Sequence, residues 1–453
     1  MRDLYAHQQS ALTYAETRSR IALFMEMRTG KSPVAVRWAL SRPRVKRVLV
    51  VAPLATLPGL GWEHELALEE ISHIIPLYDV PTARRVAATR YSGWFLLNYE
   101  GLRACPQLTS VPWDVVILDE STRIRNPRAA TSKLIVRGFK DTKYRAVLTG
   151  LPNPESALNY FGQMAFLHGE FLGCSSYWEF RQRYFHTGWA SWDWVPNAGT
   201  RDKIKAEVHR LAFVLTRKQA GVGPRKVHEQ RLVLMNAEQK RLQREIRKQF
   251  TVGDTETKYV VATQTWLSRL AGGFHPVRTS ECLNPAKMRE LASLLETELA
   301  GQPVVVWFRF NNELHAVSDY LQTRHPHGRK PLTVVGVTGD CSKDERTSAQ
   351  VGFRDGRYTV LLLQIKLAKF GWDLKAADTA VYYSNTYDYE DRVQSEDRIV
   401  SVQKTASVLY VDLVTKGSLD EEIAEAVRDK GMEARLFQQR LASATARLLA
   451  KGL

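Results

Sequence analysis

Long apolar runs and closely spaced cysteines are both missing from this 453-residue sequence. No stretch approaches the roughly 20 apolar residues of a membrane-spanning helix, and the first residues, MRDLYAHQQ, lack the apolar centre of a signal peptide. We therefore expect no membrane partner and a cytoplasmic location. The cysteines are far apart, which argues against a structural zinc site or a disulfide framework and fits a reducing compartment: Cys105, Cys174, Cys282 and Cys341.

Acidic residues are the scarcer charged type. The chain has 64 Lys and Arg against 48 Asp and Glu, a formal net charge of +16. Such a surplus favours a polyanionic partner, most often nucleic acid, with a membrane surface as the weaker alternative. Hydrophobic residues make up 44% and charged residues 25%, as in globular proteins, and the length allows two or three domains with separate cores.

Short apolar runs alternate with helical patterns in two regions of the chain. The first region, residues 1–165, contains IALFM, RVLVVAP, WFLLNYE, WDVVILDE and RAVLTG, and the second, residues 281–453, contains PVVVWFRF, YTVLLLQI and SVLYVDLV. Continuous β-rich runs separated by helices predict a parallel sheet covered on both faces. We therefore expect an α/β protein with two lobes, the second ending in C-terminal helices.

Residues 166–280 differ in texture, because aromatic and basic residues dominate and helical spacing replaces strands. This predicts a mainly helical insertion between the lobes. In AEQKRLQREIRKQF one apolar stripe recurs at every fourth residue: Leu242, Ile246 and Phe250. The stretch GWASWDW holds three tryptophans: Trp189, Trp192 and Trp194. These tryptophans belong either to the core of the insertion or to a surface that stacks on exposed bases.

The stretch FMEMRTGKSPVAV has the order of a phosphate-binding loop. An apolar run from Ile21 to Met25 suits a buried strand, and VAVRWAL after the loop has helical spacing, with Pro33 in the first turn. The N-terminus of that helix would bind an anion, Lys31 would neutralise the β and γ phosphates, and Ser32 would ligate Mg²⁺. The strict Walker A pattern fails, because Met25 stands at its first glycine, so an ordinary strand-turn-helix is the alternative.

A second stretch, WDVVILDEST, ends an apolar strand in two adjacent acids, Asp119 and Glu120. In open α/β sheets, ligands bind beyond the carboxyl ends of the strands. Asp119 would hold Mg²⁺, and Glu120 would orient or deprotonate the attacking water. The alternative is an acidic pair that merely ends a strand and begins a helix.

The order of these stretches resembles a known family. HQ, TGKS, VVAPLATL, LNYE, LDESTRIRN and LTGLP resemble the consecutive first-lobe motifs of superfamily-two helicase-like ATPases. More narrowly, DESTRIRN resembles the Asp-Glu-Ser-His-Arg-Ile-Lys-Asn of the Swi/Snf-related branch, and FRQRYF with VLTRKQAGVGPRK is similar to the helical insertion of its annealing-helicase subgroup. The stretches QIKLAKFGWDLKAADTAVYYS and EDRVQSEDR resemble second-lobe motifs V and VI. The resemblance spans nearly the whole chain and implies two RecA-like lobes, a small prokaryotic or phage-type DNA-dependent ATPase, and ATP with Mg²⁺ as cofactors.

The resemblance also implies roles for single residues. Gln8 matches the glutamine that reads adenine, and Asp119 with Glu120 matches the acid pair of motif II. Thr149 and Gly150 match the motif that couples the ATP state to lobe movement. The phosphate loop of the family is matched by four residues: Thr29, Gly30, Lys31 and Ser32.

In the second lobe, Gly371 and Asp373 match motif V, while Gln394 and Arg398 match motif VI. The family places the DNA backbone across both lobes, near these residues: Pro53, Leu54, Asn98, Tyr99, Thr338, Gly339 and Lys366. Phosphate contacts need donors and cations rather than base-specific groups, so we expect duplex or branched DNA to bind with little sequence preference. A monomer is expected.

Three positions depart from the family pattern. Arg28 stands where a glycine is usual, so the loop must admit a guanidinium near the phosphates, and Thr122 replaces a histidine of motif II. Ser401 replaces the second arginine of motif VI. Either Arg398 serves alone, or another cation such as Arg392 substitutes, or hydrolysis is weak.

The function expected from these features is a DNA-dependent ATPase that translocates on duplex or branched DNA and remodels it by branch migration or fork reversal, in bacterial or phage-infected host cytoplasm. This last step is an analogy from the fold. Two alternatives stay open: a strand-separating helicase, and a weakly catalytic DNA-binding or annealing protein that uses ATP as a switch.

Overall fold

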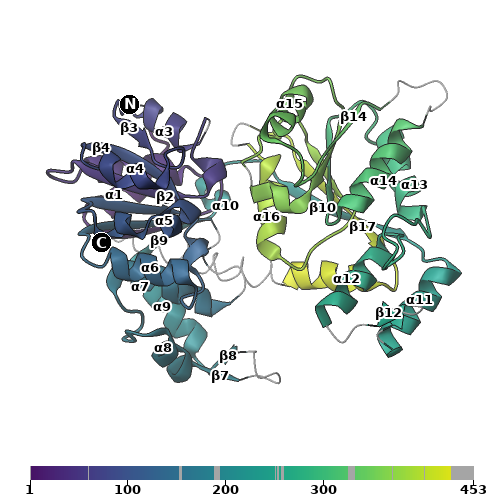
Figure 1. Ribbon diagram of the computed structural model, residues 1–453, viewed down its shortest axis with the longest axis horizontal. Helices are drawn as coiled ribbons and strands as arrows, with labels where there is room; N and C mark the ends of the chain where they lie inside the picture. The colour runs from purple at the N-terminus through teal and green to yellow at the C-terminus, as the bar shows by residue number, and fades with distance from the viewer. Residues whose placement is uncertain are drawn as a thin grey trace. The chain divides into compact units, whose positions relative to one another are not determined.

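The computed structural model describes residues 2–429 except for residues 60, 151, 153–155, 188–193, 250, 253–254, 257–259, 325–331, 370 and 402–403. The described chain divides into two compact units, with the boundary between Val222 and Gly223 (Figure 1). Each unit is built on one parallel sheet with helices on both faces. The predicted two-lobed α/β fold class is confirmed.

The first unit contains a seven-stranded sheet in the order β3-β4-β2-β5-β6-β1-β9, and all its pairings are parallel. Its strands are β1 (Arg20–Met25), β2 (Arg47–Ala52), β3 (Ile74–Pro76), β4 (Gly93–Asn98), β5 (Val115–Asp119), β6 (Tyr144–Thr149) and β9 (Ala212–Leu215). A separate antiparallel hairpin pairs β7 (Phe185–Thr187) with β8 (Trp194–Pro196).

Helices cover both faces of this sheet, and their bounds are α1 (Ala6–Glu16), α2 (Lys31–Leu40), η1 (Leu54–Thr56), α3 (Trp62–Leu68), α4 (Thr82–Ala88), α5 (Tyr99–Ala104), η2 (Pro106–Ser110), η3 (Ser121–Ile124), α6 (Ala130–Gly138), η4 (Ala157–Asn159), α7 (Tyr160–His168), α8 (Tyr177–Tyr184), α9 (Thr200–Leu211) and α10 (Arg217–Ala220). Successive residues of β1 point to opposite faces: Ile21, Leu23 and Met25 pack in the core with α1, α2 and α3, whereas Ala22 and Phe24 pack in the core with α5 to α9. Burial on both faces explains why the strand reads as a continuous apolar run.

The second unit contains a six-stranded parallel sheet in the order β10-β17-β16-β13-β15-β14. Its strands are β10 (Lys226–Val233), β13 (Val304–Phe308), β14 (Val334–Val337), β15 (Val360–Gln364), β16 (Thr379–Tyr382) and β17 (Val408–Thr415), and a two-stranded pair joins β11 (Thr251–Val252) to β12 (Thr255–Glu256). The helices are α11 (Ala237–Gln249), α12 (Val260–Ala271), α13 (Ala286–Glu296), α14 (Asn311–Gln322), α15 (Lys343–Arg354), η5 (Ile365–Lys369) and α16 (Tyr389–Arg398), and residues 419–429 are also helical.

The segment 166–280, expected as one helical insertion, is divided between the two units. Its residues 212–215 form β9, which pairs with β1, and its residues 226–233 form β10, which pairs with β17. The four residues AFVL of β9 are too few to show a period that separates strand from helix. The boundary at Val222 therefore falls inside the segment.

The described residues of the apolar stripe and of the tryptophan stretch pack against the cores of their units. Leu242 and Ile246 on α11 are buried against residues of α12, while Phe250 lies outside the described residues. Trp194 packs against the core of the first unit, and the Arg181 guanidinium lies 4.0 Å from its ring centroid. Trp189 and Trp192 also lie outside the described residues.

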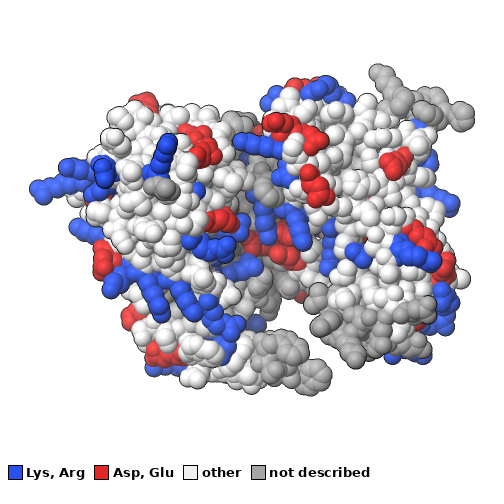
Figure 2. Space-filling view, viewed as in Figure 1, with Lys and Arg blue, Asp and Glu red and all other residues white. Residues whose placement is uncertain are grey.

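Basic side chains are spread over the visible faces of both units, as Figure 2 shows. Within the described residues, no helix combines the length and the apolar character needed to cross a bilayer. The excess of basic residues noted in the sequence is thus carried largely at the surface.

Candidate nucleotide site

The loop between β1 and α2 has the backbone form of a tight phosphate loop. Gly30 precedes α2 and has a left-handed φ of 83°, which glycine adopts without steric cost. A Cβ at Gly30 would lie 2.0 Å from Nε2 of Gln8, so there is no room for a side chain. Gln8 donates from Nε2 to the Thr29 carbonyl at 3.3 Å, and Nε2 of His7 lies 2.9 Å from the same oxygen. The start of α1 is therefore packed on the loop.

Hydrogen bonds from two polar side chains to backbone carbonyls stabilise the conformation of this loop. Lys31 is 9% exposed and donates from Nζ to the Met25 carbonyl at 2.9 Å, while the Thr29 hydroxyl donates to the Glu26 carbonyl at 2.7 Å. The loop backbone therefore folds back over the ammonium group of Lys31. Ser32 is half-buried in the first turn of α2.

Arg28, one of the three departures, has a left-handed φ of 67°. This conformation costs an ordinary residue about 1–2 kcal/mol, and glycine has no such cost. The backbone thus explains why glycine suits this position, and Arg28 occupies it with local strain.

The acid pair lies at the carboxyl end of β5. Asp119 is buried, and its carboxylate accepts hydrogen bonds from Nε1 of Trp62 at 2.8 Å and from the backbone N–H of Glu120 at 3.0 Å. Burial raises the pKa of Asp119, while the Trp62 hydrogen bond and the charge of Lys31 oppose that rise. The fold therefore places Lys31 close enough for its charge to act on the Asp119 carboxylate. Glu120 follows with a left-handed φ of 48°.

These groups fit ATP with a divalent cation. A desolvated carboxylate is stabilised by a nearby cation, and carboxylate and hydroxyl oxygens are suitable ligands for Mg²⁺. The N-terminus of the ten-residue helix α2 supplies backbone N–H groups beside Lys31. The sequence predicts that Asp119 and Ser32 supply the oxygen ligands of Mg²⁺.

The segment after β6 packs directly on the phosphate loop. Thr149 is fully buried at the end of the strand, and a Cβ on Gly150 would lie 3.0 Å from the backbone nitrogen of Met27. The lack of a side chain at Gly150 lets the two backbones approach. A movement of the phosphate-loop backbone at Met27 would therefore displace Gly150.

Gln163, which the sequence did not single out, joins motif II to this segment. Its Oε1 accepts from the Ser121 hydroxyl at 2.7 Å, and its Nε2 donates to the Pro152 carbonyl at 2.7 Å. Gln163 is fully buried on α7, so these hydrogen bonds are shielded from water. The only sequence signal for Gln163 is that this polar residue directly follows Gly162 in the otherwise apolar stretch GQMAF.

The expected DNA contacts of the first unit do not all reach the surface. Pro53 and Leu54 follow β2, with Leu54 50% exposed, and Asn98 is half-buried at the end of β4. Tyr99, in contrast, is buried, and its hydroxyl donates to the Asp119 carbonyl at 2.8 Å. The Tyr99 ring thus supports the strand end that carries Asp119, and the expectation that the DNA backbone lies near Asn98 and Tyr99 stays a prediction.

In the second unit, the carboxyl ends of β14 and β15 come together. The Gly339 N–H donates to Oε1 of Gln364 at 3.1 Å, which places Gly339 beside the exposed Lys366 on η5. Thr338 is buried, and its hydroxyl contacts the Cys341 sulfur at 3.8 Å. Gly339 and Lys366 remain the groups of this set that are suited to a phosphate backbone.

Motif V forms the turn after η5. Gly371 has a left-handed φ of 67°, and the Asp373 carboxylate pairs with Lys375 at 3.3 Å. This places both residues in one loop at the carboxyl side of the second sheet.

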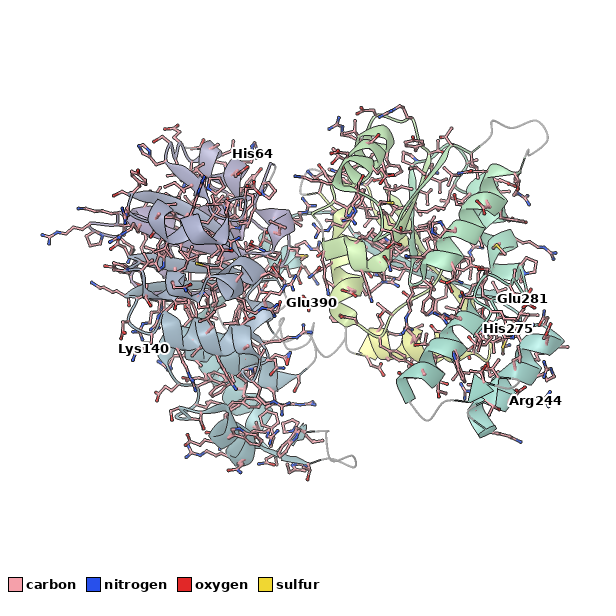
Figure 3. The ribbon with its side chains drawn as sticks, viewed as in Figure 1. His64, Lys140, Arg244, His275, Glu281 and Glu390 are labelled. Carbon is pink, nitrogen blue, oxygen red and sulfur yellow. The ribbon has the colours of Figure 1, made fainter. Side chains whose placement is uncertain are left out.

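Motif VI lies on α16. Gln394 donates to Glu390, labelled in Figure 3, at 3.1 Å, and is itself buried. Arg398, at the end of the helix, donates from Nε to the Ala368 carbonyl at 2.6 Å. The half-buried Arg398 side chain is thereby fastened to η5.

Arg392 is a core residue. It is 4% exposed, donates to Glu396 at 2.9 Å and to Asp412 at 3.1 Å, and its guanidinium lies 3.5 Å from the ring centroid of Tyr382. The charges of these carboxylates raise the pKa of Arg392. Arg392 is thus held in the core by these carboxylates, and its role as a substitute for the arginine missing at Ser401 stays an untested prediction.

Comparison with known proteins matches two family domains in succession along the chain. Residues 9–265 match the family described as SNF2-related domain, and residues 286–403 match the helicase conserved C-terminal domain. The chain belongs to the SNF2-related family. The predicted class of helicase-like ATPases is confirmed with it.

Among the relatives, the probable ATP-dependent DNA helicase CHR23 of Arabidopsis thaliana is 24% identical over 88% of this chain and 39% of its own length. The chromatin structure-remodeling complex subunit snf21 of Schizosaccharomyces pombe is 23% identical over 83% of this chain and 33% of its own. The Sulfolobus solfataricus SWI2/SNF2 ATPase core in complex with dsDNA is similar at 20% identity with a TM-score of 0.45, covering 98% of this chain and 94% of that one. The chain thus spans about two fifths or less of the length of these two curated relatives.

Proposed function

We propose that the protein is a DNA-dependent ATPase that translocates on duplex or branched DNA. The observation that carries the proposal is the position of Lys31 at the N-terminus of α2, where its charge acts on the buried Asp119 carboxylate. In this assignment Lys31 and the N–H groups of α2 hold the phosphates, and Asp119 with Ser32 holds Mg²⁺. The metal would supply neutralisation of phosphate charge.

Hydrolysis then requires a base and a cation for the transition state. Glu120 takes the proton from water as the water oxygen attacks the γ-phosphorus and the bond to the β–γ bridging oxygen breaks, releasing ADP. Arg398 is assigned to the γ-phosphate, where an arginine stabilises the charge that spreads over the transferring group. Gln8, packed on Gly30, is assigned to the adenine.

DNA binding is proposed from the charge of +16 and from exposed groups beyond the carboxyl ends of the strands, including Lys366. The SNF2-related family membership supports this partner. Within this proposal, branch migration or fork reversal by a monomer in a bacterial or phage-infected cell is the specific form that we favour.

The test is ATP hydrolysis with no nucleic acid, single strand, duplex, fork and four-way junction, each at low and moderate salt. We expect duplex or branched DNA to stimulate hydrolysis. The logarithm of the DNA-binding constant should fall linearly with the logarithm of the salt concentration, with a slope of roughly −0.9 for each neutralised phosphate. If none of these DNA substrates stimulates ATP hydrolysis, the proposal is wrong.

A second candidate function, an ATP-switched DNA-binding or annealing protein, is favoured by motif VI. Ser401 stands at the second-arginine position, and Arg392 is sequestered in the core. Such a protein would bind and release DNA with ATP while turning over slowly. Single-turnover hydrolysis, followed beside strand displacement on a fork, separates it from both the translocase and a strand-separating helicase.

A further inference from the structure

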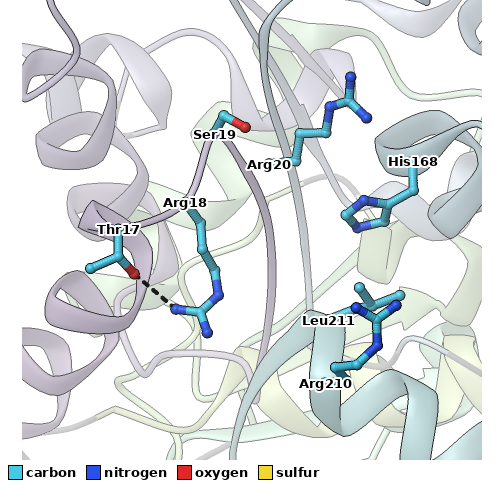
Figure 4. Close-up of a pocket in the computed structure, with 7 residues that line it drawn as sticks. All are labelled: Thr17, Arg18, Ser19, Arg20, His168, Arg210 and Leu211. Atoms are coloured by element: carbon cyan, nitrogen blue, oxygen red, sulfur yellow. Dashed lines mark hydrogen bonds between the residues drawn. The ribbon is translucent and has the colours of Figure 1, made fainter. Parts of the chain in front are cut away.

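A polar cavity lies in the first unit, at the end of β1 opposite the phosphate loop. It has a volume of about 530 Å³, within the usual size range of ligand pockets. Seven described residues line it and none of these carries a carboxylate: Thr17, Arg18, Ser19, Arg20, His168, Arg210 and Leu211 (Figure 4). We call it the arginine pocket.

The guanidinium groups come from three separate elements. Arg18 follows α1, Arg20 begins β1, and Arg210 lies in the last turn of α9. In Figure 4 the His168 imidazole lies between the Arg20 and Arg210 side chains. The tertiary fold, and not one local run of basic residues, gathers this charge.

Helix dipoles account for part of the cluster. Cations are favoured at helix C-termini, where Arg18 and Arg210 lie, and Arg210 also pairs with Glu207 at 2.6 Å. Arg20 has no such explanation, because it is on a strand, directly opposite Arg145 in the register of β1 with β6. The guanidinium of Arg145 donates to the carbonyls of Phe139 and Lys140 at 3.1 Å.

The pKa of His168 shows that the pocket is positively charged. Burial, followed by the charges of Arg20, Arg145 and Arg210, lowers its pKa from 6.5 to about 4, with Glu207 opposing the shift. Its Nε2 is buried without a hydrogen-bond partner among the described residues. The imidazole is therefore a neutral side chain in a positively charged environment. A bound oxyanion would hydrogen-bond to its unpartnered Nε2 and offset the positive charge.

We propose that the arginine pocket binds a phosphate group, held by Arg20, Arg18 and Arg210 and hydrogen-bonded to His168. Guanidinium pairs are suited to phosphate oxygens, and a bound dianion would offset the mutual repulsion of the three arginines. The phosphate has two sources with the same chemistry: the backbone of DNA, or a free phosphate compound. The pocket is distinct from the nucleotide site, because β1 separates them by its six residues, about 20 Å of strand.

The experiment uses the full chain and follows the His168 imidazole resonances by NMR, so that phosphate binding at the loop near Lys31 does not interfere. Inorganic phosphate should shift these resonances saturably and raise the pKa of His168, because an adjacent anion favours the charged imidazole. Arg20→Gln should weaken this binding about tenfold or more, since a hydrogen bond to a charged group is lost. Arg90→Gln, an exposed arginine on the same unit, is the matched control and should leave it unchanged.

Duplex DNA distinguishes the two sources. If the pocket takes a backbone phosphate, Arg20→Gln lowers the salt slope of duplex binding by roughly 0.9, and if it takes a free phosphate, the slope stays as in Arg90→Gln. Should Arg20→Gln fail to fold, the exposed Arg18→Gln replaces it in both arms. Phosphate that leaves the His168 resonances unmoved, together with an unchanged slope, would overturn the proposal whatever the ATPase assay shows.

Discussion

The indole N–H of Trp62 donates to Oδ2 of Asp119 at 2.8 Å, joining the first turn of α3 to the carboxyl end of β5. The hydrogen bond lowers the pKa of Asp119 against the effect of burial. A residue outside the expected motifs thus favours the charged form of the proposed metal ligand.

Trp62→Phe is therefore expected to move the pH dependence of hydrolysis. Without the hydrogen bond the pKa of Asp119 rises, so the acid limb of kcat/KM at limiting Mg²⁺ should move to higher pH. Trp38→Phe is the control, because Trp38 is buried in the same core and its Nε1 donates to Arg18 instead. Identical acid limbs in the two variants would contradict the role given to Trp62.

Lys31→Ala should lower DNA-stimulated hydrolysis about 10²-fold or more, as removal of a donor to developing charge does. Nucleotide affinity should also fall, because Lys31 is the cation of the loop. Lys366→Ala is the comparison, since Lys366 is exposed on the second unit and should alter the salt slope of DNA binding instead. Hydrolysis by Lys31→Ala at the parent rate would show that the site has been assigned wrongly.

Glu120→Gln should separate binding from chemistry. The amide keeps the shape and hydrogen bonding of the side chain but cannot take a proton, so ATP and DNA should bind while turnover collapses. Equilibrium nucleotide binding and single-turnover hydrolysis measure the two effects. Loss of ATP affinity with turnover retained at saturation would contradict a role as base.

Arg398→Ala and Arg392→Ala should fail in different ways. Loss of a transition-state arginine lowers turnover by about 10³ to 10⁵ with a much smaller effect on ATP binding. Arg392→Ala instead leaves Asp412 and Glu396 buried without their cation, which costs about 3–5 kcal/mol of stability. Thermal unfolding and turnover per folded molecule distinguish them, and an Arg392→Ala protein of parent stability with no turnover would return Arg392 to the site.

Glu313 predicts a stability change with pH. It is fully buried, accepts from the Ser384 hydroxyl at 2.5 Å, and burial raises its pKa from 4.5 to about 7. The native state then binds more protons than the unfolded state between these values, so stability falls as pH rises through that window. The loss is on the order of 3 kcal/mol.

Glu313→Gln should remove that slope, measured as unfolding free energy or melting temperature from pH 4.5 to 8. The exposed Glu345→Gln, which keeps a capping residue at the start of α15, should retain it. Equal slopes in the two variants would mean that Glu313 is charged throughout.

Much of the fold and of the site could be predicted, because both depend on patterns within short stretches of the sequence. Continuous apolar strands that end in TGKS and in Asp119-Glu120 mark the carboxyl edge of the first sheet. Side-chain burial could not be predicted, since it depends on segments far apart in sequence: Tyr99 lies under Asp119, and Arg392 pairs with Asp412. A basic or aromatic residue in a motif looks the same whether it faces a ligand or the core.

The pairing of β1 with β9 has a consequence for how the chain folds. Glu26, in the phosphate loop, is bonded through its N–H to the Leu215 carbonyl at 2.9 Å and through its carboxylate to the Arg217 N–H at 3.0 Å, a separation of 191 residues for the second pair. Such non-local contacts form late and slow folding. During synthesis, β1 remains an edge strand with open hydrogen-bonding groups until Ala212 to Leu215 have been made. A chain that stops before Ala212 would therefore expose the edge beside its phosphate loop and invite association with other chains.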